Sequence, residues 1–493
     1  MIAEAIQMVL FNPVCILLIL VGVIIGIIFG SIPGLSASMA LILFLPMSFG
    51  MEPMNGISLL IGLYLGGISG GLISAILLKI PGTASSIASV FDGGPMADNG
   101  EAGKALGVGI LTSFVGGLIS IFALMFISPY LAKVTLAFTS AEYFAISIFA
   151  LTIISSLSGK SLINGILAGL FGIALSLVGI APVDGAIRFT FGQSQLYGGF
   201  ETVVILIGLY AVTDIIKTGF DRKNIVNSST KYEYNLKGYG ISVKQYLSHW
   251  RNIIQSALIG LGVGILPGIG GSTSSLLSYT AARGSSKHPE KFGTGIVDGI
   301  IASETANNAL IGGSLIPLIT MGIPGNVATA IFLGGLTIHG ISPGPLIFQK
   351  SGQYVYGIFI ALLIANVFML IFERAGLRIF VKLLDIPKYI LLPIVMVCCI
   401  VGAYCANYSI FDVWCVAIFG LMGLLFKTLN VPSTPMIIGF ILGSMTEENL
   451  RQALMQTDGN WSIFVTRPIS FVFLIIALIS VIMTIKKQVS KQN

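Results

Sequence analysis

The chain has 493 residues, of which 55% are hydrophobic and only 9% are charged, and its mean hydropathy is +0.96. A soluble domain usually carries about 25% charged residues, so this chain must meet lipid over much of its surface, which excludes a soluble protein. The net charge of +6 fits the basic cytoplasmic loops of a membrane protein and is not the signature of a nucleic-acid-binding protein.

Long apolar stretches recur along the chain. A helix of about 20 apolar residues spans a bilayer, and such stretches include Pro13–Gly30, Gly107–Ile127, Glu201–Ile216, Gly357–Phe372, Ile390–Cys405 and Pro468–Ile485. The 60 glycines and 19 prolines are more than simple spanning helices need, and they indicate close helix packing and broken helices. We therefore predict an all-α polytopic membrane protein of about 10–14 transmembrane helices, some of them broken or re-entrant.

The longest polar stretch, residues 219–249, is rich in Lys and Arg. Basic loops of membrane proteins tend to face the cytoplasm. We therefore predict a cytoplasmic linker over 219–249. It joins a first membrane half, residues 1–218, to a second half with C-terminal helices, residues 250–493.

Two ordered motifs recur in both halves. The segment at 30–38, GSIPGLSAS, matches GILPGIGGS at 264–272, and the segment at 80–89, IPGTASSIAS, matches IPGNVATAIF at 323–332. Many secondary transporters are built from repeats of opposite membrane orientation. We therefore predict two inverted structural repeats, although Ser36 has Gly270 as its counterpart and the two loops are not equivalent.

Each motif contains a Pro-Gly pair, which breaks a helix. Proline lacks an N–H and clashes with the preceding turn, and glycine permits unusual dihedral angles. A helix that restarts there exposes N–H groups carrying about half a positive charge, and such a helix start binds anions. Carbonyl oxygens exposed at the same breaks, near Gly34, Gly82, Gly268 and Gly325, are candidate ligands for Na⁺.

Hydroxyl and amide side chains follow these breaks. They can cap the restarted helix or hold carboxylate oxygens, and Ser and Thr also simply permit close helix packing. The predicted substrate site consists of Pro33, Gly34, Ser36, Ser38, Pro81, Gly82, Thr83, Ser85, Pro267, Gly268, Ser272, Thr273, Pro324, Gly325 and Asn326.

Positive side chains are scarce near the second pair of motifs, since no Lys or Arg occurs from Phe292 through Gln349. Helix dipoles alone balance a multivalent anion poorly in a low dielectric, so a co-bound cation would help, which favours a symporter. The candidates for holding Na⁺ or a proton are Asp298, Glu304, Asn307 and Asn308. The alternative for these four side chains is helix capping or a surface loop. We expect no other cofactor.

This ordered set of motifs resembles the TctA family, the large membrane subunit of tripartite tricarboxylate transporters. The segments that carry the resemblance are 30–38, 80–96, 100–103, 264–275, 288–290, 304–309, 323–325 and 339–345. The resemblance implies a permease subunit of the bacterial inner membrane that imports citrate-like tricarboxylates or related carboxylates by Na⁺ or H⁺ symport. It also implies two partners, a small TctB-like membrane subunit and a TctC-like periplasmic solute-binding protein.

The sequence also bears on three other functions. A permease of the same family for a different organic anion would carry the same motifs, and an anion channel is a further alternative. A membrane enzyme would need a clustered nucleophile, metal ligands or an acid and base. The three histidines and scattered cysteines form no such cluster, so we predict no catalytic residues.

Overall fold

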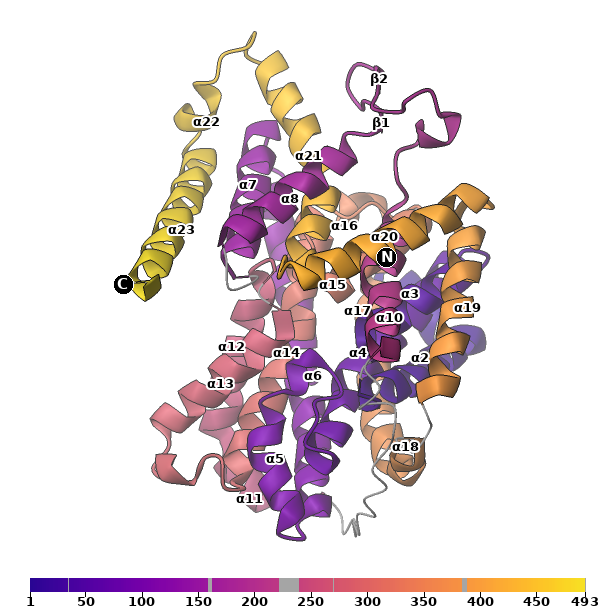
Figure 1. The fold of residues 1–493 in the computed structure, drawn as a ribbon. Coiled ribbons are helices and arrows are strands. Elements are labelled where there is room, and N and C mark those ends of the chain that lie inside the picture. The colour runs from indigo at the N-terminus through magenta and orange to yellow at the C-terminus, as the bar shows by residue number, and fades with distance from the viewer. Residues whose placement is uncertain (34, 158–161, 221–238, 269, 384–387, 493) are drawn as a thin grey trace. The chain divides into compact units, whose positions relative to one another are not determined.

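The structure is a computed structural model that describes residues 1–492 except 34, 158–161, 221–238, 269 and 384–387. Helices dominate the fold (Figure 1). Within these residues the single sheet is a short antiparallel pair, β1 (Gly179–Ile180) and β2 (Ile187–Arg188). The predicted all-α architecture is confirmed.

Six helical segments of the described chain are long and apolar enough to cross a membrane. They are α2 (Pro13–Ser31), α4 (Pro53–Leu77), α6 (Ala102–Thr135), the segment Thr202–Gly219, α17 (Gly352–Ala375) and α20 (Ile410–Thr428). This confirms a multi-pass membrane protein. The inverted orientation of the two repeats stays a prediction, and most of the predicted linker lies outside the described residues.

The chain forms two compact units. The first unit contains residues 1–130, 214–265 and 270–398, and the second contains 131–213, 266–269 and 399–493. Of the spans above, α2, α4, α17 and most of α6 belong to the first unit. Its other helices are α1 (Ile2–Leu10), α3 (Ala37–Ser48), η1 (Ala84–Ser86), α5 (Ser89–Asp98), α11 (Val243–Ser248), α12 (Trp250–Ile265), α13 (Gly270–Ser285), η5 (Pro289–Lys291), α14 (Val297–Met321), α15 (Val327–Ile338), α16 (Ile347–Lys350) and α18 (Leu377–Leu383).

The second unit contains the remaining helices. They are α7 (Ser140–Leu157), α8 (Leu162–Ser176), η2 (Ser194–Leu196), α9 (Thr202–Leu206), the π-helix η3 (Ile207–Val212), the span α20, α21 (Ser433–Met455), α22 (Ile463–Thr466) and α23 (Pro468–Gln492). Helices α7, α8 and α21 lie side by side (Figure 1). The α10 (Thr213–Phe220) and α19 (Lys388–Asn407) helices each contain residues of both units.

Glycines bring two helix pairs of the first unit into backbone contact. In the first half, a Cβ on Gly26 of α2 would lie 2.6 Å from the carbonyl oxygen of Leu63 in α4. In the second half, a Cβ on Gly264 of α12 would lie 2.8 Å from the carbonyl oxygen of Leu310 in α14. Such distances leave no room for a side chain, so small residues are what allow these helices to pack so closely.

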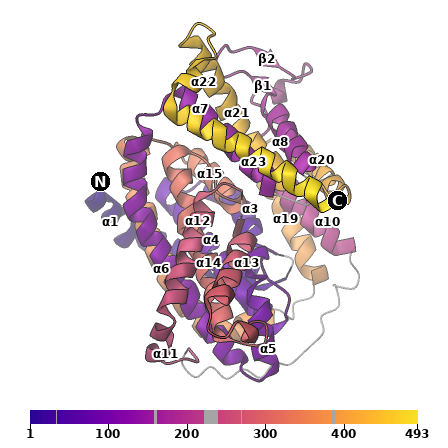
Figure 2. The same ribbon diagram turned by 90° about the vertical axis from the view of Figure 1, so that its left-hand side faces the viewer.

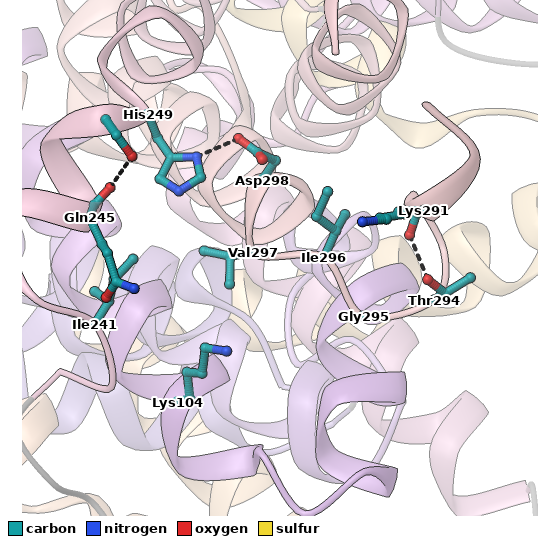
Figure 3. A pocket seen from close by; sticks show the side chains of 11 residues that line it. Lys104, Ile241, Gln245, His249, Lys291, Thr294, Gly295, Ile296, Val297 and Asp298 are labelled. Atoms are coloured by element: carbon teal, nitrogen blue, oxygen red, sulfur yellow. Dashed lines mark hydrogen bonds and ion pairs between the residues drawn. The ribbon is translucent and has the colours of Figure 1, made fainter. Parts of the chain in front are cut away.

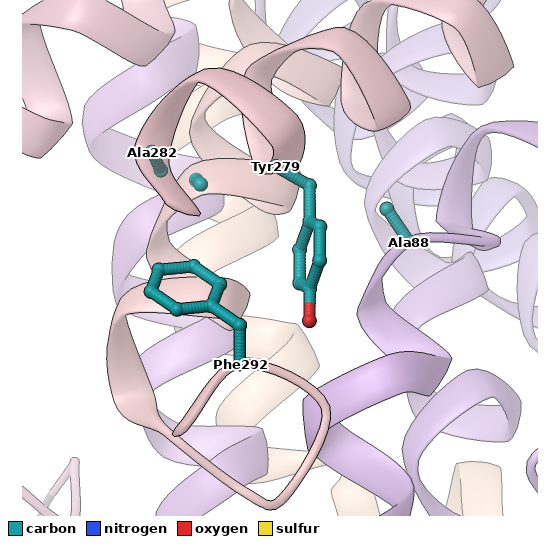
Figure 4. Close-up of a cluster of buried hydrophobic side chains, with 5 residues drawn as sticks. Ala88, Tyr279, Ala282 and Phe292 are labelled. Carbon is teal, nitrogen blue, oxygen red and sulfur yellow. The ribbon is translucent and has the colours of Figure 1, made fainter. Parts of the chain in front are cut away.

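A buried aromatic cluster joins α13 to the segment before α14. Tyr279, Phe292, Ala88, Ala282 and Ala302 pack together (Figure 4). The rings of Tyr279 and Phe292 meet edge to face, with centroids 5.3 Å apart, a favoured aromatic geometry.

A buried carboxylate fixes the same segment. Asp92 of α5 accepts backbone N–H groups from Gly293, Gly295 and Ile296 at 2.9, 2.9 and 3.0 Å. Its second oxygen accepts the hydroxyl of Tyr279 at 2.8 Å. A side chain of the first half therefore holds the chain at the start of α14, the helix that carries most of the polar residues described below.

Candidate functional site

The four predicted breaks are present as gaps between helices. In the first half α2 ends at Ser31 and α3 begins at Ala37, and in the second half α12 ends at Ile265 and α13 begins at Gly270. Gly34 lies outside the described residues. Gly268 has a φ of +81°, which belongs to the left-handed region that glycine tolerates. The predicted broken helices are confirmed.

The second break of each half follows a long buried helix. After α4, Pro81 and Gly82 lie in a non-helical segment that leads into η1. After α14, Gly322 takes the left-handed conformation at φ +73°, and the chain passes through Pro324 and Gly325 to α15. Local sequence explains both ends, because proline cannot continue a helix and, at α14, glycine also permits the left-handed C-terminal geometry.

Two predicted substrate residues act as helix caps. Ser36 Oγ accepts the N–H of Met39 at 3.1 Å. Asn326 Oδ1 accepts the N–H of Thr329 at 3.0 Å, and Thr329 Oγ1 accepts the N–H of Asn326 at 2.9 Å. The amide of Asn326 also donates to the hydroxyl of the buried Tyr64 at 3.3 Å. Capping thus accounts for the contacts of Ser36 and most of those of Asn326, and substrate binding by either residue stays a prediction.

Residues of the two halves meet at the start of α13. The hydroxyl of Ser275 donates to the backbone carbonyls of Ser85 and Gly271. A Cβ on Gly271 would lie 2.5 Å from Ser85 Cβ and 3.6 Å from Asn307 Oδ1. The loop after Pro81-Gly82, the restarted helix α13 and a polar turn of α14 therefore converge on one place.

The remaining predicted hydroxyls divide between the inside and the surface of the unit. Thr83 is buried and its Oγ1 lies 3.0 Å from Ser85 Oγ. On α13, Ser272 is half-buried and Thr273 is exposed. The next two residues, Ser274 and Ser275, are buried. Ser38 lies half-buried in the first turn of α3.

Glu304 lies at the centre of the polar turn of α14 and is fully buried. Its carboxylate accepts hydrogen bonds from the hydroxyl of Ser89, from Ser113 Oγ at 3.3 Å and from Asn307 Nδ2 at 3.3 Å. No ion pair of Glu304 occurs within the part of the chain that the structure describes. Asn307 Oδ1 is buried and has no hydrogen-bond partner there.

Asn308 and Asp298 have other surroundings. Asn308 Nδ2 donates to the carbonyl of Glu304, one turn back on the same helix, at 3.1 Å. Asp298 Oδ1 lies 2.8 Å from His249 Nδ1 and 3.0 Å from Asn252 Nδ2. Six residues separate Asp298 from Glu304, or about 9 Å along a helix. Asp298 therefore lies apart from the polar turn, and its predicted cation role stays untested.

Asp298 faces a cavity of about 360 Å³ that contains both positive and neutral polar groups (Figure 3). The lining residues with charged or titratable side chains are Lys104, His249, Lys291 and Asp298. The hydrogen bond with Asp298 outweighs burial and raises the pKa of His249 above its ordinary value. Burial raises the pKa of Asp298, but the hydrogen bonds from His249 and Asn252 outweigh that effect and lower it.

Glu373, a fully buried acid in the last turn of α17, was not predicted from the sequence. Its Oε2 accepts the hydroxyl of Ser69 in α4 at 2.6 Å. A signal for it was available, because an acidic residue inside an apolar span is expensive and therefore points to function. Ser89 and Ser113, which donate to Glu304, had no such signal.

Helices that break in pairs around buried hydroxyls, amides and a carboxylate define the class of secondary transporters. The chain matches the family described as the Tripartite tricarboxylate transporter TctA family over residues 16–438, and it belongs to that family. It is accordingly a transporter component and not an enzyme.

Two curated relatives come from Agrobacterium vitis, and both are described as uncharacterised. One, a 52.8 kDa protein in the TAR-I ttuC′ 3′ region, is 33% identical over 96% of this chain and 94% of its own length. The other, in the TAR-II ttuC′ 3′ region, is 34% identical over 45% of this chain and 92% of its own length. No solved structure matches the chain significantly.

Proposed function

We propose that this chain is the permease subunit of a carboxylate importer in the bacterial inner membrane, and that it couples uptake to Na⁺ or H⁺. Citrate-like tricarboxylates and related carboxylates are the proposed substrates. The observation that carries the proposal is the convergence of a restarted helix, α13, with a buried carboxyl and an unpartnered amide oxygen on α14.

The start of α13 supports binding of the anion. The first turn of a helix offers N–H groups without partners inside the helix, and these attract carboxylates. Gly271 keeps the backbone open there, since a Cβ would collide with Ser85. Two hydroxyl side chains, Ser85 and Ser275, lie beside this turn.

The polar turn of α14 supports binding of the cation. Asn307 Oδ1 and the Glu304 carboxylate are buried oxygen atoms of neighbouring turns, and oxygen is the ligand that hard cations prefer. A buried carboxylate without a positive partner is costly, so a cation or a proton at Glu304 would relieve that cost. An anion at α13 and a cation at α14 would also balance each other.

Family membership supports two partners, because the family belongs to tripartite transporters. We propose a small TctB-like membrane subunit and a TctC-like periplasmic binding protein. A permease of this family for a different organic anion would use the same geometry. An anion channel is the less favoured alternative, because a channel needs no buried carboxyl beside its anion site.

The test is uptake of labelled citrate and a panel of dicarboxylates into cells that express the chain with both partners. We expect accumulation against the substrate gradient, dependent on Na⁺ or on pH. Uptake insensitive to both would contradict symport, and equilibration without accumulation would indicate a channel.

A matched pair of variants tests the polar turn in the same assay. Asn307→Ala removes the unpartnered oxygen, so we expect a tenfold or greater rise in the cation concentration needed for half-maximal uptake. Asn308→Ala removes an amide that donates to a carbonyl of its own helix, so we expect a smaller effect. Equal effects of the two substitutions would argue against a cation at Asn307.

A further inference from the structure

Glu373 is a fully buried carboxyl of the first unit, like Asp92 and Glu304, and its hydrogen bonding is incomplete. Oε2 accepts the Ser69 hydroxyl at 2.6 Å, whereas Oε1 is buried and has no partner in the described part of the chain. Burying an ionised carboxylate is costly unless it is paired and hydrogen-bonded. Glu373 must therefore hold a proton or a cation when it is in this position.

Positive charge does not reach this carboxyl. Its chain neighbour Arg374 stacks on the ring of Tyr239, 4.5 Å from the ring centroid. No ion pair of Glu373 occurs among the described residues, so no positive side chain there offsets the charge of an ionised Glu373.

The helices packed against α17 are α1, α2, α4, α6, α16 and α18. Their titratable or charged groups are the N-terminus and Glu4 of α1, Cys15 of α2, Tyr64 of α4, Lys104 and Tyr130 in the first-unit part of α6, Lys350 of α16, and Arg378 and Lys382 of α18. Lys104 pairs with Glu101 at 3.2 Å. The N-terminus and Glu4 pair with each other at 3.1 Å, and Tyr64 is hydrogen-bonded to Ser314 and Asn326. Among the described residues, the hydroxyl of Ser69 is the hydrogen-bonding neighbour of Glu373. A single hydroxyl provides too few oxygen ligands for Na⁺, whereas a proton on the carboxyl needs no further ligands.

Adjacent residues of α4 connect Glu373 with the polar turn of α14. Ile68 accepts a hydrogen bond from Asn307 Nδ2 at 3.5 Å through its backbone carbonyl, and the next residue, Ser69, donates to Glu373. A shift of α4 against its neighbours would therefore alter the contacts of Asn307 and of Glu373 together. This is the physical link that coupling between a substrate site and a proton site requires.

Two further buried oxygens of the first unit could bind the water molecules that carry a proton to Glu373. Thr305 Oγ1 and Asn366 Oδ1 have no partner within the described residues, and both residues pack against the Gly116-Gly117 pair of α6. Asn366 precedes Glu373 by seven residues, or about two helical turns on the same face. Buried polar atoms without protein partners normally bind ordered water, and water can carry protons along α17.

We propose that Glu373 carries the coupling proton: its carboxylate takes up a proton as the substrate enters, and the neutral acid releases that proton as the substrate leaves. This inference rests on the proposed function, because the proton must move with a carboxylate. It assigns the proton to α17 and leaves the oxygens of Glu304 and Asn307 to hold a cation that balances the bound anion.

The test uses the chain reconstituted with its two partner subunits in liposomes. One assay measures carboxylate accumulation driven by an imposed pH gradient. The other measures exchange of labelled for unlabelled carboxylate at equal concentrations, which moves substrate without net proton release. We expect Glu373→Gln to lose at least tenfold in accumulation and to keep exchange within about threefold of the wild type. Glu142→Gln is the control, because this buried acid lies 3.8 Å from Arg467, and its ratio of the two activities should not change.

Several results would overturn the proposal. Accumulation by Glu373→Gln at the wild-type level would do so, and so would loss of both activities in a variant that is recovered folded and monodisperse. If Glu373→Gln does not fold, Glu373→Asp and Glu373→Asn are compared, and accumulation in both or in neither overturns it. A wild type that responds to a Na⁺ gradient and not to a pH gradient refutes the role of Glu373 but leaves symport intact. A wild type that transports no carboxylate refutes the proposed function itself.

Discussion

Gly325 packs directly on Gly264, since a Cβ on Gly325 would lie 2.7 Å from the Gly264 carbonyl oxygen. The first half repeats this relationship, because a Cβ on Gly82 would collide with the carbonyl of Gly30. In each half, the Pro-Gly loop after the long buried helix therefore rests on a glycine in the last turn of an earlier helix, Gly30 of α2 or Gly264 of α12. The recurrence of this contact in both halves agrees with the internal repeat inferred from the motifs.

These two contacts predict that Gly82→Val and Gly325→Val abolish carboxylate uptake. Overpacking of this kind typically costs about 1–3 kcal/mol, and here it would push each loop off its helix. Membrane insertion, measured by the amount of protein in washed membranes, should persist. Gly50→Val is the control, because Gly50 has open space around it. Normal uptake by both loop variants would show that the packed loops are dispensable.

Asn326 can be tested as a cap and as a ligand by one substitution. Aspartate caps a helix about as well as asparagine and interacts favourably with the helix dipole, so Asn326→Asp should change the free energy of unfolding by less than about 1 kcal/mol. A negative charge would nevertheless repel a bound carboxylate. We expect uptake to fall at least tenfold while thermal stability in detergent is kept. Unchanged uptake would indicate that Asn326 is a cap alone.

Asp92 should be the more important partner in its contact with Tyr279. Asp92→Ala would leave three backbone N–H groups and one hydroxyl without their acceptor, which we expect to cost about 3–5 kcal/mol. Tyr279→Phe removes one donor and should cost about 1 kcal/mol. Thermal unfolding of the two purified variants measures both changes. A Tyr279→Phe variant as unstable as Asp92→Ala would contradict this ranking.

The pair of His249 and Asp298 predicts a pH-dependent stability. The pKa of His249 is raised by Asp298. The stability that protonated His249 contributes is therefore fully present below about pH 6.5 and is lost as the pH rises through the raised pKa. The pKa of Asp298 is lowered, so its contribution is present above about pH 3.9 and is lost as the pH falls through the lowered value. The pair should therefore stabilise most between about pH 4 and 6.5.

Comparison of the wild type with His249→Gln measures this effect. We expect the wild type to have the larger free energy of unfolding. The difference from the variant should be about 1 kcal/mol greater at pH 6 than at pH 8.5, and thermal unfolding at the two pH values measures it. Asn252→Ala is the control, since it removes a neutral donor to the same carboxylate and should weaken stability at both pH values. A stability difference independent of pH would exclude a charged His249.

Local features of the fold could be predicted from sequence, because their causes are local. Pro-Gly pairs end helices wherever they occur, and Asn326 with Thr329 three residues later is a cap signature. The rotation of α13 about its axis is set by packing against α14. The sequence alone does not reveal this rotation. Ser272 and Thr273 were therefore predicted to bind substrate, whereas the hydroxyls of Ser274 and Ser275 are buried in the structure.

The polar contacts between distant segments could not be predicted in this way. Ser113 and Glu304 are separated by 191 residues, and Ser69 and Glu373 by 304. A single serine in an apolar stretch carries no pattern that identifies its partner. Glu373 itself could have been singled out by its charge, but its connection with Ser69 depends on the packing of α17 against α4.

The glycine contacts also limit how this unit can move. Helices α2 and α4, and likewise α12 and α14, touch backbone to backbone, so neither pair has compressible side chains between its members that could absorb a slide. Each pair should therefore travel as a stiff block. Any rearrangement that opens the site first to one side of the membrane and then to the other must occur between the blocks, where hydroxyl and amide contacts can be exchanged at little cost.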